Sequence, residues 1–181
     1  MPAQKPLEAL TLSRLPTPIG EALVVTDAEA KVRAFDWADH EPRMRRLVAR
    51  YNAGSVLEEG PAPDAVRSAL NAYFQGDFAA FDSLDLETGG TEFQCACWAA
   101  LTEIPAGETR SYGQQAVVIG KPKAVRAVGL ANGANPIGLI IPCHRVIGAD
   151  GSLTGYGGGI ERKRWLLRHE GAAFNDGRLA A

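Results

Sequence analysis

The sequence predicts an α+β protein, on three observations. Alternating polar and apolar residues early in the chain predict a short antiparallel sheet. Later segments repeat apolar residues at helical spacing and begin with capping residues. Two of these helices, joined by a short turn, have the pattern of a helix-turn-helix. We therefore expect a small N-terminal α/β domain, residues 1–88, and a mainly helical C-terminal domain, residues 89–181, with a winged-helix-like helix-turn-helix.

The N-terminal domain is expected to combine a hairpin with two helices. Residues 1–13 show little pattern, and no regular element is predicted there. The expected elements are a turn at 16–20, strands at 22–26 and 31–37 joined by a turn at 27–30, and helices at 41–51 and 64–74. The Arg-rich helix 41–51 is interpreted as a solvated face. Gly89 and Gly90 mark the expected domain boundary.

The C-terminal domain is expected to begin with a helix at 91–104. Thr91 and Gln94 have the spacing of a capping box. Cys97 falls on the apolar face of this helix and is interpreted as core. A second helix, 112–118, is capped by Ser111.

A third helix, 123–132, follows a turn at 119–122, and its two faces are expected to differ. Helical spacing directs one set of residues inward: Ala124, Ala127, Val128 and Ala131. Another set points outward: Arg126, Gly129 and Leu130. A loop at 148–159 and a final helix at 160–169 complete the domain. An outward Gly in mid-helix costs about 1 kcal/mol against Ala, so its presence suggests close approach of another backbone.

Composition and charge restrict the class of protein. The chain is 46% hydrophobic and 22% charged, as in soluble globular proteins, and has no apolar run long enough to span a membrane. No signal-peptide pattern is present and the three cysteines are odd in number, so a cytoplasmic protein without disulfides is expected. Residues 1–89 hold nine Lys and Arg against fourteen Asp and Glu, whereas residues 90–171 hold nine against six. A phosphate-binding surface is therefore possible in the second half.

A short stretch around Cys143 carries the candidate chemistry. Apolar residues surround a single thiol, with His144 and Arg145 next in sequence. A thiolate is a strong nucleophile, and a neighbouring base or positive charge can generate it. The opposing interpretation is a buried core cysteine. Pro142 argues against a central strand here. The CxC pair at Cys95 has no second cysteine pair, so no metal or other cofactor is expected.

Several motifs together resemble one family. In chain order they are Ser111-Tyr112, RAVG at 126–129, Asn135-Pro136, PCHRV at 142–146, GYGG at 155–158 and WLLRHEG at 165–171. This set is similar to the O6-alkylguanine-DNA alkyltransferases, most of all the stand-alone bacterial type. The likeness is close over residues 89–171 and holds only in outline before them.

The resemblance implies a single-turnover methylated-DNA–protein-cysteine methyltransferase that repairs O6-alkylguanine, and also O4-alkylthymine, in duplex DNA. Cys143 would keep the alkyl group, with Glu170, His144 and a water as its activating relay. Neighbours along a strand face opposite ways, so His144 is not expected to reach the thiol directly. Asn135 would brace the turn beneath the thiol, and Tyr112 would donate to the leaving guanine oxygen.

The same resemblance implies how the lesion is held. The backbone carbonyls of Cys143 and Val146 would accept from the guanine amine. Tyr156, Gly157 and Gly158 would line the alkyl pocket, and the two glycines suggest room for bulky alkyl groups. The base must leave the duplex, and Arg126 would fill the gap. The DNA-binding residues would be Tyr112, Ala124, Val125, Arg126 and Gly129. A monomer is expected, with cooperative assembly on DNA left open.

Three alternatives stay open at this point. A relative that binds lesions without repair would lack the reactive cysteine, which Cys143 supplies here. A cysteine hydrolase would turn over repeatedly. A helix-turn-helix protein without alkyl transfer would bind DNA and leave its own mass unchanged.

Overall fold

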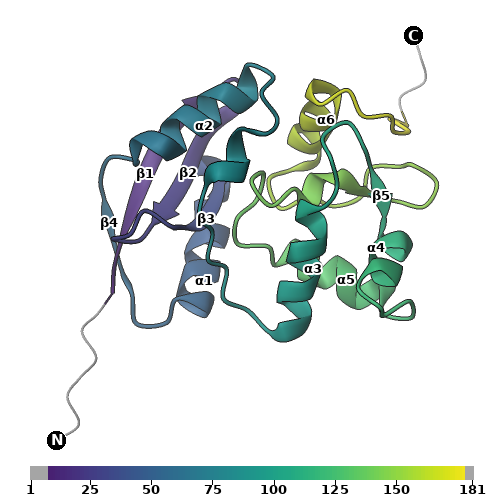
Figure 1. Cartoon of the computed structure of the whole chain (residues 1–181), viewed down its shortest axis with the longest axis horizontal. Helices are drawn as coiled ribbons and strands as arrows, with labels where there is room; N and C mark the ends of the chain where they lie inside the picture. The colour runs from purple at the N-terminus through teal and green to yellow at the C-terminus, as the bar shows by residue number, and fades with distance from the viewer. Residues whose placement is uncertain (1–7, 178–181) are drawn as a thin grey trace, which may run out of the picture.

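A four-stranded sheet forms the first half of the molecule. The computed structural model describes residues 8–177. The first elements are β1 (Ala9–Thr17), β2 (Gly20–Thr26), β3 (Val32–Trp37), α1 (Glu41–Tyr51), β4 (Val56–Glu59) and α2 (Asp64–Phe74), with 3₁₀ turns at Ala38–His40 and Ala80–Ser83. The sheet order is β3-β2-β1-β4, antiparallel except for the β1–β4 pair. This confirms the expected strands and both helices, and Figure 1 shows the sheet with α1 and α2 at the left.

Strand β1 corrects one expectation. Residues 9–13 are not irregular but pair with β2 and β4. Leu10 and Leu12 alternate with Thr11 and Ser13, which is the strand signal in this segment. Residues 1–7 lie outside the described part. Strand β4 was not predicted, because four residues ending in two glutamates at a sheet edge carry almost no hydrophobic pattern.

The two faces of the sheet are covered differently. Helix α1 packs Met44 and Val48 on one face, against Leu10, Leu12, Leu23, Val25 and Ala34. The opposite face belongs to a larger cluster that continues into the second half of the chain. Its members from the first half include Val24, Phe35, Trp37 and Tyr73. The division at residue 88 stays a prediction, since this apolar cluster has members on both sides of it.

Four helices and a small strand pair form the second half. They are α3 (Glu92–Thr102), β5 (Arg110–Ser111), α4 (Tyr112–Val118), α5 (Val125–Gly133), a 3₁₀ turn (Cys143–Arg145), β6 (Val146–Ile147) and α6 (Ile160–His169). Figure 1 shows α3 to α6 on the side of the molecule opposite the N-terminal sheet. Helices α4 and α5 are the two members of the expected helix-turn-helix, and the winged-helix detail stays a prediction.

Local capping explains where two of these helices begin. Thr91 and Gln94 form the expected capping box of α3, and Ser111 with Gln114 forms a second at α4. In α5 the inward set is only partly right: Val128 and Ala131 are buried, but Ala127 is exposed. Asn132 is buried in its place. The helix begins at Val125, so Ala124 lies before it, and the buried residues Val128, Ala131 and Asn132 have the spacing i, i+3, i+4 of one helix face.

Hydrogen bonds join the two halves along the free edge of β3. The amide of Phe35 donates to Pro136 O at 2.9 Å, and that of Gly138 donates to Phe35 O at 3.2 Å. The turn that leads to Cys143 is therefore attached to the sheet as a further short pairing. No helix within residues 8–177 is long and apolar enough to cross a membrane.

The capping box gives a stability prediction. Thr91→Ala should lower the free energy of unfolding by about 1 kcal/mol, because the Gln94 amide loses its acceptor. Thr102→Ala, at the other end of α3, should change it by less than about 0.5 kcal/mol. Urea unfolding of both variants measures the difference, and equal values would contradict the capping role.

Candidate active site

Cys143 lies where three segments meet. A 3₁₀ turn carries Cys143, His144 and Arg145. Strand β6 follows at once and pairs with β5, so the N-terminus of α4 with Tyr112 is held beside the turn. The expected strand geometry at the thiol is wrong: the chain is in a 3₁₀ turn, and Pro142 starts it. Even so, His144 makes no hydrogen bond to the thiol, as expected, because its Nδ1 atom has no partner within the described residues.

Asn135 closes the turn that presents the thiol. Its Nδ2 donates to Ile141 O at 2.9 Å, and its Oδ1 accepts from the Ile137 amide at 3.0 Å. Both ends of the turn are thus tied to one fully buried side chain. Within the turn Leu139 has a φ of 66°, a strained value for a non-glycine residue. The bracing geometry expected for Asn135 is present in the structure.

Glu170 is buried rather than exposed, although it follows the last turn of α6. Its Oε1 lies 2.8 Å from His144 Nε2 and accepts from the Tyr73 hydroxyl at 2.7 Å. Arg145 donates to both carboxylate oxygens, at 3.0 Å each. Burial alone would raise the pKa of Glu170, but its hydrogen bonds from His144 and Arg145 and the positive charge of Arg145 hold that pKa well below its usual range. Glu170 is therefore a buried carboxylate anion.

The hydrogen bond from His144 fixes its tautomer. A neutral imidazole beside a carboxylate carries its proton on the facing nitrogen, here Nε2. Burial lowers the pKa of His144, with Glu170 opposing. The imidazole is thus neutral, and its Nδ1 lone pair is free to accept a proton.

Three groups oppose the rise in the pKa of the Cys143 thiol that burial causes. Burial raises the pKa of Cys143, while a hydrogen bond from Asn135 and the positive charges of Lys163 and Arg43 lower it. The sequence suggested Arg145 as the positive charge that favours the thiolate, but Arg145 instead donates to Glu170 and to the carbonyl of Ile104. The thiol consequently needs a base to become a nucleophile at neutral pH.

Lys163 and Arg43 had no signal in the motif pattern. Lys163 is fully buried, and its Nζ donates to the carbonyls of Val146 (2.6 Å) and Thr154 (3.1 Å). Burial lowers the pKa of Lys163 to about 8. In the sequence, only the spacing of the apolar residues along α6 could have indicated that Lys163 faces the protein interior.

Arg43 corrects the interpretation of α1 as a solvated face. It donates to Asp36 at 2.6 Å and to the Gly133 carbonyl at 2.7 Å. The N-terminal half thus supplies a positive charge next to the site, and nothing in the Arg-rich pattern of α1 distinguishes this arginine from its neighbours.

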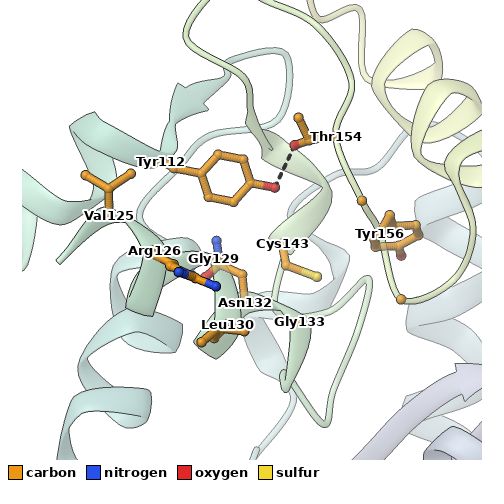
Figure 2. Close-up of a pocket in the computed structure, with 12 residues that line it drawn as sticks. Tyr112, Val125, Arg126, Gly129, Leu130, Asn132, Gly133, Cys143, Thr154 and Tyr156 are labelled. Carbon is orange, nitrogen blue, oxygen red and sulfur yellow. Dashed lines mark hydrogen bonds between the residues drawn. The ribbon is translucent and has the colours of Figure 1, made fainter.

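A cavity of about 580 Å³ opens above the thiol. It is lined by Tyr112, Val125, Arg126, Gly129, Leu130, Asn132, Gly133, Cys143, Thr154, Gly155, Tyr156 and Gly157. Figure 2 shows Tyr112 and the α5 residues on one side and Tyr156 on the other, with the Cys143 sulfur between them. The Thr154 hydroxyl donates to the Tyr112 hydroxyl at 2.8 Å across this space. The cavity brings together most of the residues expected to bind lesion and DNA.

Three expected site residues do not line this cavity. Ala124 precedes α5, beside the turn between α4 and α5. Val146 is fully buried, and its carbonyl already accepts from Lys163. Gly158 is buried beneath Tyr156, where an added Cβ would lie 2.5 Å from Trp37 Nε1. The small size of Gly158 therefore permits close packing and adds no room to the large cavity.

Together these features define a helix-turn-helix protein with a cysteine-centred reaction site. Residues 92–172 match the family model described as 6-O-methylguanine DNA methyltransferase, DNA binding domain. The methylated-DNA–protein-cysteine methyltransferase of Salmonella typhimurium is 47% identical over 160 residues, which cover 87% of this chain and 94% of the relative. The Mycobacterium tuberculosis protein of that name is 61% identical over 113 residues, 61% of this chain and 68% of the relative.

A solved structure agrees with these sequence relatives. The crystal structure of Mycobacterium tuberculosis OGT in complex with DNA superposes with a TM-score of 0.75 at 42% identity, covering 89% of this chain and 92% of that one. The chain belongs to the methylated-DNA–protein-cysteine methyltransferase family. The expected family and fold class are thereby confirmed.

The position of Gly158 gives a prediction. Gly158→Ala should destabilise the protein by about 1–3 kcal/mol, because the new methyl group collides with Trp37 and Tyr156. Gly155→Ala meets no atom within 4 Å and should stay within about 0.5 kcal/mol of wild type. Denaturant unfolding compares the two, and an equally stable Gly158→Ala variant would refute the packing role.

Proposed function

We propose that this protein repairs O6-alkylguanine in duplex DNA by moving the alkyl group irreversibly onto Cys143. The observation that carries the proposal is the placement of the thiol: it lies in the cavity beside α5 and next to the buried His144–Glu170 pair. The curated relatives are named for transfer of a methyl group from DNA to a protein cysteine, and OGT has been crystallised with DNA. Both support the same assignment here.

Thiol activation follows from the charge state of the buried groups. The neutral His144 presents a free Nδ1, so it takes the Cys143 proton through one water molecule. Glu170 stabilises the imidazolium that results. The thiolate then attacks the alkyl carbon, the S–C bond forms as the C–O6 bond breaks, and the electron pair leaves on guanine. The thioether is stable, so one protein molecule repairs one lesion.

The cavity walls would bind the base and assist its departure. Tyr112 is half-buried at the mouth and keeps its proton, because burial raises the pKa of its phenol. It therefore donates to the developing guanine anion. The carbonyl oxygen of Cys143, on the cavity wall, accepts one internal hydrogen bond and retains a second lone pair for one of the two N–H groups of the guanine amine. The acceptor role expected for the Val146 carbonyl stays a prediction, because this carbonyl already accepts from Lys163. Tyr156 and Gly157 line the opposite wall.

Helix α5 would dock on DNA and keep the base extrahelical. Arg126 is exposed at the cavity, and the apolar side chains of Val125 and Leu130 beside it are 40% and 71% exposed. Apolar and arginine side chains together suit a minor groove from which a base has been removed. Gly129 has no side chain to project from this face, so the DNA backbone can approach closely. A Cβ at this position would lie 3.8 Å from the Tyr112 ring, which is ordinary van der Waals contact. Ala124 would contact DNA from the turn before the helix.

The cellular location follows from the proposed substrate. Duplex DNA of a bacterium lies in the cytoplasm, and the Salmonella and Mycobacterium relatives are bacterial proteins. We therefore place the protein's activity there.

Intact-mass analysis tests the proposal directly. Mixing with a duplex that contains O6-methylguanine should add one methyl group in place of the thiol proton, with one lesion consumed per protein. Peptide mapping should locate it at Cys143 and leave Cys95 and Cys97 unmodified. Cys143→Ala should bind the duplex without a change in mass. Repeated turnover, or an unchanged mass in wild type, would favour a hydrolase or a simple DNA-binding protein.

The relay predicts the behaviour of Glu170→Gln. Transfer should slow by roughly 10- to 100-fold, since the imidazolium loses its carboxylate. The pH profile should move to higher pH, because a weaker base leaves more of the thiol protonated. Glu161→Gln, whose side chain is 71% exposed on the same helix, should transfer at the wild-type rate. Stopped-flow measurement across pH 6–9 compares them, and an unshifted profile would exclude the relay.

The Glu170→Gln substitution should also change how the stability of the protein depends on pH. The folded pKa of Glu170 is lowered, so its ionisation stabilises the protein above the unfolded carboxyl pKa of about 4.3, and this contribution is lost as pH falls below it. Wild type should therefore lose stability on acidification more steeply than Glu170→Gln.

A further inference from the structure

Asn132 lies on the cavity wall but has no role in the reaction described so far. It belongs to α5, one turn after Gly129, and is only 6% exposed. It lines the same space as Cys143 and Tyr112, and Figure 2 shows it beside Cys143 and below the Tyr112 ring. Its carboxamide is therefore close to the position that an extrahelical base would occupy.

The carboxamide of Asn132 is unpaired. Neither Nδ2 nor Oδ1 has a hydrogen-bond partner among residues 8–177. Asn135, three residues later and also buried, has partners for both atoms. Buried polar groups are nearly always paired, so an amide with two unpaired ends on a cavity wall indicates a partner that enters the cavity.

We propose that the Asn132 carboxamide binds the polar edge of the alkylated base, donating from Nδ2 and accepting at Oδ1. This inference rests on the proposed function. Alkylation at O6 removes the proton from the neighbouring ring nitrogen, so the lesion presents an acceptor nitrogen beside the exocyclic amino donor. A primary amide is complementary to this pair. Intact guanine presents two donors there, and one of them would face a donor of the amide.

The pairing also assists the reaction. As the C–O6 bond breaks, negative charge develops on the guanine oxygen and the adjacent ring nitrogen. The Nδ2 donor strengthens its bond to that nitrogen during the step and so favours the transition state over the bound lesion. Asn132 thus contributes to selection of the lesion and to its rate of transfer.

Asn132→Leu tests this assignment because leucine has a similar size without the polar atoms. Transfer from free O6-benzylguanine and from an O6-methylguanine duplex should each fall about 10- to 100-fold. Affinity for undamaged duplex and the rate of Cys143 with iodoacetamide should stay at wild-type values. The melting temperature should not fall, because the side chain makes no hydrogen bond to any residue from 8 to 177.

A second buried asparagine is the matched control. Asn52, at the end of α1, also has an unpaired Nδ2 but accepts from Arg33 at 2.9 Å, and it lies outside the cavity. Asn52→Ala should lower the melting temperature and leave the transfer rate per folded molecule unchanged.

Three results would overturn the assignment: a wild-type rate with the free base, a loss confined to the duplex substrate, or a fall in melting temperature with slower reaction toward iodoacetamide. The second would indicate a backbone contact with DNA, and the third a structural role. Failure of wild type to gain mass would refute the proposed function instead, independently of this variant.

Discussion

The buried carboxylate of Glu170 is the group on which the rest of the structure depends. It comes from the end of α6 and is contacted by His144 and Arg145 from the 3₁₀ turn and by Tyr73 from α2. A charge removed from water is costly unless it is paired and hydrogen-bonded, and loss of one partner costs about 3–5 kcal/mol. The carboxylate therefore holds three distant segments in one arrangement. The same arrangement orients the imidazole with its free nitrogen available to the thiol.

The N-terminal sheet is part of the site although it carries none of the motif residues. Its edge strand pairs with the turn that presents Cys143, and Trp37 at the end of that strand packs against Gly158. Arg43 brings a positive charge that acts on the thiol. A C-terminal fragment would keep the helix-turn-helix and the nucleophile, but it would lose the support beneath the turn and one of the charges that offset the burial of Cys143. The sheet thus determines how well the nucleophile is positioned.

Sequence patterns predicted the elements better than the contacts between them. The helices 41–51 and 64–74, the capping box at Thr91 and the cap at Ser111 follow from local rules, and the structure confirms them. The structure also brings Cys143, Tyr112 and Arg126 to one cavity. Lys163, Arg43 and the burial of Glu170 were missed, because a charged residue on an amphipathic helix looks the same in sequence whether it faces water or a buried partner. The packing of Gly158 on Trp37 depends on a contact between the two halves that no local pattern encodes.

Two unpaired polar groups close to the thiol affect both the stability of the protein and its function. His144 Nδ1 and the Asn132 carboxamide are both buried without partners in the described structure. Each such group costs about 1–3 kcal/mol in the free protein. A protein selected for stability alone would replace or pair them. Their position is explained if a water molecule supplies the missing bond of His144 and the substrate supplies those of Asn132, because the cost at Asn132 is then recovered only when a lesion is bound. The free protein is less stable for this reason, and the recovered free energy adds to the preference for a damaged base over an intact one.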